Sequence, residues 1–141
     1  TYYGLGCRSG SKIMVPEGYN FDTFFKCIYE YHEIIKSAKY ANNYDYNKAV
    51  YLMSNYKLLE NGFLMLKEDT SYSSPIATLF YETYSDKEML RKKLVDDKEK
   101  IQCIVSNDFS DTSIKFGATQ SPRLWDYADG IDTIKFLTKK C

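Results

Sequence analysis

The stretch GLGCRSGSKIMVP, residues 4–16, decides how this chain begins to fold. Residues 13–15 form a short apolar strand that Pro16 ends, because proline cannot donate the next hydrogen bond of a sheet ladder. Ahead of the strand, glycines and serines surround a single thiol, and glycine permits backbone angles that other residues avoid. The pattern predicts a tight loop that leads directly into a strand.

Cys7 lies within this loop, with Arg8 beside it. A neighbouring guanidinium stabilises the thiolate form of a cysteine, which is its nucleophilic form. The loop therefore predicts a reactive nucleophile at Cys7. The opposing interpretation is that Cys7 is a small buried hydrophobic residue without a chemical role.

Two helices are predicted after the first strand. Apolar residues recur at helical spacing over residues 21–38, and Asn20 is placed to cap this helix. The second helix covers residues 45–56 and is expected to bury one face, made of Tyr46, Ala49, Val50 and Met53. Asn61 and Gly62 then mark a turn.

Strands and helices continue to alternate in the rest of the chain. Strands are expected at residues 63–66 and 76–84, and Ser85 with Glu88 forms a capping box that opens a charged helix. The remaining expected elements are strands at residues 101–105 and 114–116 and a short helix from Ser121 and Pro122 to Gly130. This alternation predicts an α/β fold with a largely parallel sheet.

The composition narrows the class of protein. The chain has 141 residues, which is enough for one domain with its own core. Its net charge is zero, so the composition shows no excess of basic residues of the kind that binds nucleic acid. The four cysteines are too widely spaced for a metal or disulfide framework, so no metal is expected. No signal peptide or long apolar run occurs, so we expect no membrane span and a cytoplasmic location.

Residues 6–12 and the strand after them resemble the nucleophile segment of the aldehyde dehydrogenase superfamily, where small residues, a serine and a basic residue follow a catalytic cysteine. The closer resemblance is to the LuxC family of fatty acyl-CoA reductases. The stretches that carry it follow the expected order over nearly the whole chain: residues 4–16, 40–46 (YANNYDY), 73–76 (SSPI), 100–106 (KIQCIVS) and 124–133 (LWDYADGIDT).

This resemblance implies a three-layer sandwich like the aldehyde dehydrogenase catalytic domain. It also implies that Cys7 takes the acyl group of acyl-CoA as a thioester, which NADPH then reduces to a fatty aldehyde. The sequence holds no Gly-x-Gly-x-x-Gly fingerprint. Residues 1–141 are therefore expected to be the C-terminal part of the acyl-binding catalytic domain, inactive alone, with the cofactor-binding half outside this chain.

The loop at residues 71–75 is the second segment to which the resemblance gives a role. In hydrolytic aldehyde dehydrogenases the similar loop carries a glutamate four residues before a proline, and here that position is Ser71. Loss of this carboxylate suits a reductase, which must keep water away from the thioester. The resemblance makes Ser71 and Ser73 candidate cofactor-binding residues; the alternative is a plain serine-rich turn.

Other polar residues are assigned structural roles. His32, the only histidine, is predicted to be solvated or structural rather than a general base, because it falls in the middle of a helix. Asp126, Asp129 and Asp132 lack the spacing of a calcium loop and are expected to cap turns. Cys27 and Cys103 are expected to be buried and unreactive, and Cys141 to be terminal and mobile.

The expected partners are an acyl-CoA substrate and an acyl-transferring or acyl-activating enzyme. A tyrosine-rich face near the N-terminus is expected to favour a homo-oligomer. Two other function classes stay open. One is a non-catalytic α/β interaction or acyl-binding module in which Cys7 is incidental, and the other is a cysteine acyltransferase or hydrolase without a cofactor.

Overall fold

The computed structural model describes residues 3–110 and 113–139, with only the backbone of Asp129. The chain divides into two units, Thr1–Val95 and Asp96–Cys141. The first unit carries the sheet and its helices, and it holds both segments that the sequence associates with chemistry. The second unit consists mainly of turns and short helices.

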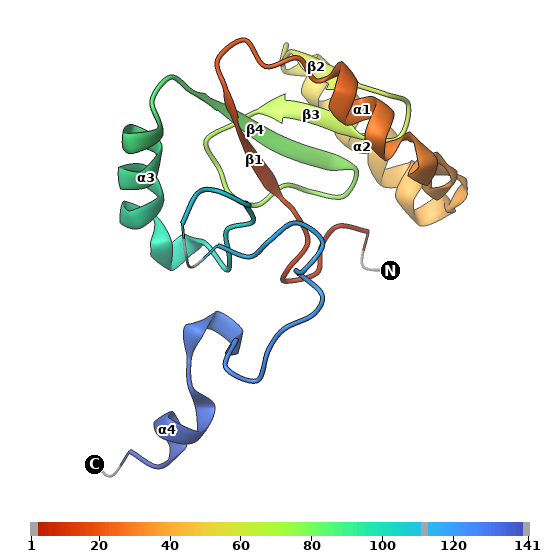
Figure 1. The fold of residues 1–141 in the computed structure, drawn as a ribbon. Helices are drawn as coiled ribbons and strands as arrows, with labels where there is room; N and C mark the ends of the chain where they lie inside the picture. The colour runs from red at the N-terminus through yellow and green to blue at the C-terminus, as the bar shows by residue number, and fades with distance from the viewer. Residues whose placement is uncertain (1–2, 111–112, 140–141) are drawn as a thin grey trace. The chain divides into compact units, whose positions relative to one another are not determined.

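The sheet of the first unit has four strands in the order β1-β4-β3-β2. They are β1 (Lys12–Pro16), β2 (Leu58–Glu60), β3 (Met65–Glu68) and β4 (Thr78–Tyr84). Strands β1 and β3 both run parallel to β4, which lies between them, and β2 is antiparallel to β3 (Figure 1). The predicted mixed α/β class with a largely parallel sheet is therefore confirmed.

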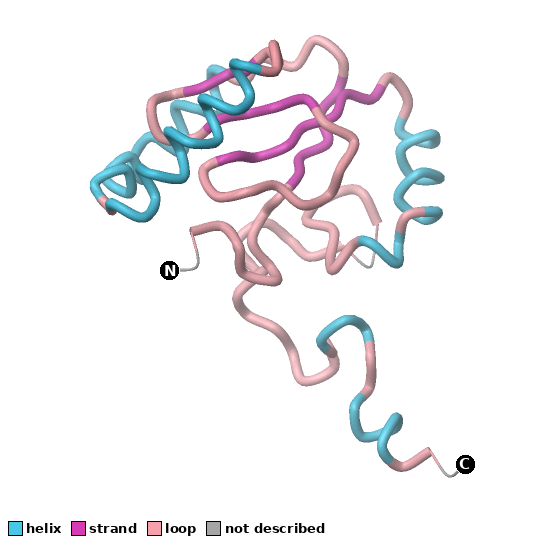
Figure 2. Tube along the Cα trace, turned by 180° about the vertical axis from the view of Figure 1, so that it is seen from behind, coloured by secondary structure: helices cyan, strands magenta, loops and turns pink. Residues whose placement is uncertain are grey.

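Helices α1 (Asp22–Ile28) and α2 (Ala38–Met53) cover opposite faces of this sheet (Figures 1 and 2). Met65 and Leu66 are neighbours in β3, so their fully buried side chains point to opposite faces. Leu66 packs in the cluster on the α1 side, with Val15, Phe21 and Leu79. Met65 packs in the cluster on the α2 side, with Tyr40, Tyr44 and Ala77.

The single helix predicted over residues 21–38 is wrong. Helix α1 ends at Ile28, a 3-10 helix η1 (Tyr29–Lys36) follows, and Ser37 is extended before α2 begins. A straight helix cannot pack on both faces of one sheet, so the chain changes direction between α1 and α2. Helix α1 begins at Asp22 with Phe21 at the N-cap position, so Asn20 is not the cap as predicted; its side chain instead accepts a hydrogen bond from the Asp22 N–H at 2.8 Å in the turn before the helix.

The second helix was predicted with the wrong buried face and the wrong bounds. Tyr46 and Met53 are exposed, and α2 instead buries Tyr40 and Tyr44. The Tyr40 hydroxyl donates to the Phe63 carbonyl at 2.9 Å, and the Tyr44 hydroxyl donates to Glu60 at 2.5 Å. Because both hydroxyls find partners on the β2–β3 hairpin, tyrosine is stable inside. Burial raises the pKa of Tyr40 to about 12.

Local signals located β3, β4 and α3 with small errors, whereas the short strand β2 was not predicted. The Asn61 side chain accepts hydrogen bonds from the Phe63 and Leu64 N–H groups, which confirms the predicted turn, and β3 and β4 each begin two residues later than predicted. Helix α3 (Lys87–Asp96) buries Leu90 and Leu94. Its cap is Asp86 rather than Ser85, since the Asp86 carboxylate accepts from the N–H groups of Glu88 and Met89.

The second unit departs most from the expected pattern. The predicted strands at residues 101–105 and 114–116 reduce to one parallel bridge between Val105 and Ile114. No helix begins at Ser121, because the Asp126 carboxylate accepts from the Arg123 N–H at 2.8 Å and closes a turn there. The regular elements described in this unit are η2 (Lys98–Lys100), η3 (Ala128–Gly130) and α4 (Thr133–Leu137).

Candidate functional site

Cys7 lies in a tight turn immediately before β1. The Ser9 N–H donates to the Gly6 carbonyl at 2.8 Å, which closes a turn with Cys7 and Arg8 at its centre. Gly4 has φ +86°, a left-handed conformation that favours glycine at this position. The Cys7 side chain is exposed, so the thiol is accessible to a ligand. The opposing interpretation, that Cys7 is a buried hydrophobic residue, is therefore wrong about its burial.

The loop between β3 and β4 carries Ser71 and Ser73, and both of these side chains are exposed. Near its start, the Ser71 N–H donates to the Asp69 carboxylate at 2.8 Å. At its end, the Thr78 N–H donates to the Pro75 carbonyl, and Ala77 takes φ 61° inside that turn. A buried residue other than glycine in this conformation is held there by its surroundings.

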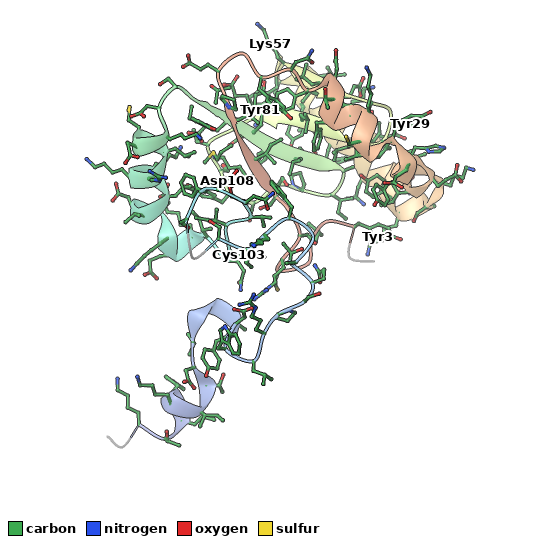
Figure 3. All side chains as sticks on the ribbon, viewed as in Figure 1. Tyr3, Tyr29, Lys57, Tyr81, Cys103 and Asp108 are labelled. Carbon is green, nitrogen blue, oxygen red and sulfur yellow. The ribbon has the colours of Figure 1, made fainter. Side chains whose placement is uncertain are left out.

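Residues on both sides of Cys7 are anchored to the rest of the first unit, and Lys12 contacts this loop. Tyr3 (labelled in Figure 3) packs against the cluster that contains Ala77, and its ring lies 5.8 Å from that of Tyr40. The Lys12 ammonium donates to the Thr70 carbonyl at 2.8 Å. The Lys12 bond thus links the strand that follows the Cys7 turn to the start of the loop that carries Ser71 and Ser73, across 58 residues of sequence.

A buried lysine supports the base of the same loop, and sequence reasoning missed it. Lys67 of β3 pairs with Asp69, and its side chain is only 6% exposed. Its ammonium lies 4.1 Å from the ring centroid of Tyr56 and about 5 Å from those of Tyr51 and Phe80. The available signal was strand alternation, because Lys67 follows the buried Met65 by two residues and therefore shares its face.

Asp69 makes the free energy of unfolding depend on pH under acidic conditions. The hydrogen bond from Lys67, and after it the bond from the Ser71 N–H, lower the pKa of Asp69 to about 2. A carboxylate with a depressed folded pKa adds stability above its unfolded pKa, which is about 3.9 for aspartate. That stability is lost as the pH falls through the folded pKa.

We therefore expect the difference in free energy of unfolding between wild type and Asp69→Asn to be largest above about pH 5 and to shrink toward pH 2. Denaturant unfolding at a series of pH values measures this difference. A difference that stays constant from pH 5 to pH 2 would contradict the ion pair.

His32 has the structural, partly solvated surroundings that were predicted for it. Its ring stacks on Tyr29 with 4.9 Å between centroids, and its nitrogens contact the Tyr29 carbonyl and the Glu33 carboxylate. Of the C-terminal acidic residues, Asp126 closes a turn and Asp132 caps α4, as expected. Among the described residues, no group of three or more His, Cys, Asp or Glu side chains is placed to hold a metal ion.

The surroundings of two other thiols were predicted wrongly. Cys27 is exposed, because α1 turns Phe24 and Phe25 toward the sheet and leaves Cys27 outside that face. Cys103 (labelled in Figure 3) is half-buried in a segment that forms no strand. Cys141 lies outside the described residues. Accessibility alone therefore does not distinguish Cys7 from Cys27; the glycine turn does, together with the following strand that binds the serine loop.

Within residues 3–110 and 113–139, no helix has both the length and the apolar character needed to cross a bilayer. Comparisons with protein-family models, with curated proteins and with solved structures find no match for this chain.

Proposed function

We propose that this chain is the nucleophile-bearing part of an acyl-CoA reductase of the LuxC type, with a domain like the aldehyde dehydrogenase catalytic domain. The observation that carries the proposal is an exposed cysteine in a glycine turn, followed by a strand whose Lys12 binds the start of a loop with two exposed serines. Neither segment alone indicates a reaction, but in this proposal the nucleophile and the polar loop linked to its strand together form a site for covalent catalysis.

In this proposal the Cys7 thiolate attacks the carbonyl carbon of acyl-CoA. The tetrahedral oxyanion accepts a hydrogen bond from the Cys7 backbone N–H, and its collapse expels CoA as a thiolate. The acyl group is then held on the Cys7 sulfur as a thioester. Because Ser71 occupies the position of the hydrolytic carboxylate, the loop supplies no base to activate water.

The exposed hydroxyls of Ser71 and Ser73 fit a polar ligand such as a nicotinamide, because the anchored loop holds their backbone in place. When bound there, NADPH would supply the hydride that reduces the thioester to an aldehyde, and the Cys7 sulfur would leave as the thiolate. In this proposal most of the nucleotide is bound by a part of the enzyme outside these 141 residues, and the isolated chain does not reduce acyl-CoA.

The test is to locate the acyl group. We expect full-length protein incubated with a long-chain acyl-CoA, without NADPH, to carry a thioester on Cys7 and not on Cys27, Cys103 or Cys141. Quenching in acid and peptide mass spectrometry identify the modified residue. Cys27 is the internal control, because it is also exposed. Equal acylation of Cys27 and Cys7 would show reaction with any accessible thiol and would refute the proposal.

A further inference from the structure

Lys12 is a nearly buried lysine that joins the strand after Cys7 to the loop of Ser71 and Ser73. Its side chain is 5% exposed. The ammonium donates to the Glu82 carboxylate at 2.7 Å and to the Thr70 carbonyl at 2.8 Å, and it lies 4.7 Å from the ring centroid of Tyr72. The Lys12 ammonium therefore contacts one strand residue, Glu82, and two residues of the loop, Thr70 and Tyr72.

The charge of Lys12 is compensated by Glu82 on the neighbouring strand. Burial works to raise the pKa of Glu82, but the hydrogen bonds from Lys12 and Lys93 together outweigh burial and lower that pKa. The carboxylate therefore stays ionised at neutral pH and forms an ion pair with Lys12. A charged donor makes a stronger hydrogen bond to a carbonyl than a neutral donor does. The bond to Thr70 is therefore suited to fix the loop.

The backbone of Lys12 has little freedom to follow the loop. Lys12 is the first residue of β1 and pairs with Phe80 of β4, and the Phe80 N–H donates to the Ser11 carbonyl at 3.1 Å. Lys67 pairs with the same Phe80 from the other side, in β3. The loop base is thus held by two buried ammonium groups in one row of the sheet, and only Lys12 belongs to the strand that follows Cys7.

We propose that Lys12 is a positioning residue that holds the Ser71–Ser73 loop at a set place relative to Cys7. This inference rests on the proposed function. Through Thr70 and Tyr72, Lys12 determines where the two serine hydroxyls meet the nicotinamide. It contacts neither the Cys7 sulfur nor the acyl group, so it governs cofactor placement and leaves the acylation step unchanged.

Lys93 offers a matched control. It also pairs with the Glu82 carboxylate, but it belongs to α3 and is 32% exposed. Lys12→Met and Lys93→Met each remove one lysine from the same carboxylate, and only the first removes the bond to the Thr70 carbonyl. A difference between the two variants therefore reports the contact with the loop rather than the loss of an ion pair.

The experiment uses the full-length protein and two measurements. NADPH affinity is measured by fluorescence titration, and the rate of Cys7 acylation without NADPH is measured by quenched mass spectrometry. We expect Lys12→Met to raise the Kd for NADPH about tenfold, the loss expected for a hydrogen bond to a charged group, with acylation within about twofold of wild type. Lys93→Met should leave both values within about twofold.

Tyr72→Leu is a second variant that removes the aromatic ring from Lys12 and retains the Lys12–Glu82 pair. We expect it to weaken NADPH binding about threefold without slowing acylation. If Lys12→Met does not fold, this variant alone tests the positioning role of Lys12. An unchanged Kd in Tyr72→Leu, or equal behaviour of Lys12→Met and Lys93→Met, would overturn the positioning role. Absence of acylated Cys7 in the wild type would instead refute the proposed function.

Discussion

The Cys7→Ser variant of the full-length protein is expected to form aldehyde from acyl-CoA at least about 10³-fold more slowly than wild type. A serine hydroxyl is a far weaker nucleophile than a thiolate unless a base activates it. His32 is engaged by Tyr29 and Glu33 in η1, so it is not placed to act as that base. Gas chromatography of the aldehyde, with NADPH oxidation measured in parallel, gives the rate.

The control for this loss is Cys27→Ser, which removes an exposed thiol outside the glycine turn. It should retain the wild-type rate. If Cys7→Ser makes aldehyde normally, the nucleophile assignment fails and the non-catalytic module becomes the better explanation. Release of free fatty acid by the wild type, without aldehyde and independent of NADPH, would favour the hydrolase alternative.

The Asp69→Ala variant is expected to lower the free energy of unfolding by about 2–4 kcal/mol. Lys67 is 6% exposed, and Asp69 is the carboxylate that pairs with it. Removing only Asp69 leaves a charged ammonium in a site that water reaches poorly. The rings of Tyr51, Tyr56 and Phe80 retain part of the compensation, so the expected loss is below that for an isolated buried charge. Denaturant unfolding at pH 7 measures it.

Two further variants separate charge burial from other causes. Lys67→Met combined with Asp69→Ala should recover stability to within about 1 kcal/mol of wild type, because a methionine can fill the aromatic site without a charge. Glu33→Ala breaks an exposed pair with Lys36 and should change stability by less than about 0.5 kcal/mol. An Asp69→Ala effect as small as that of Glu33→Ala would show that Lys67 does not depend on its carboxylate.

Local sequence was sufficient for those parts of the site that depend on a few neighbouring residues. The glycine-rich turn before β1, the loop between β3 and β4 and the Asn61 turn follow from glycine, proline and asparagine chemistry that acts within four residues. The same signals predicted an α/β unit, because strand and helix periodicities differ and alternate along the chain.

Lys12, Lys67 and Asp69 were not predicted as parts of the site, although they anchor its loop. A lysine in a sequence is ordinarily assigned to the surface, because burial of an unpaired ammonium is unfavourable. Their burial depends on Glu82, on the end of α2 and on the pairing of β1 and β3 with β4. These partners are distant in sequence, so only the assembled sheet shows that the charges are compensated.

The sequence by itself determined the class of the first unit, the place of its turns and the glycine-lined position of Cys7. Only the tertiary structure decided that α1 and α2 separate onto opposite faces, that Tyr40 and Tyr44 point inward, and that Lys12 of β1 binds the start of the Ser71–Ser73 loop. The physical reason is the range of the interactions. Turns and periodicity depend on backbone preferences of adjacent residues, whereas which face a helix buries depends on the sheet surface that it meets.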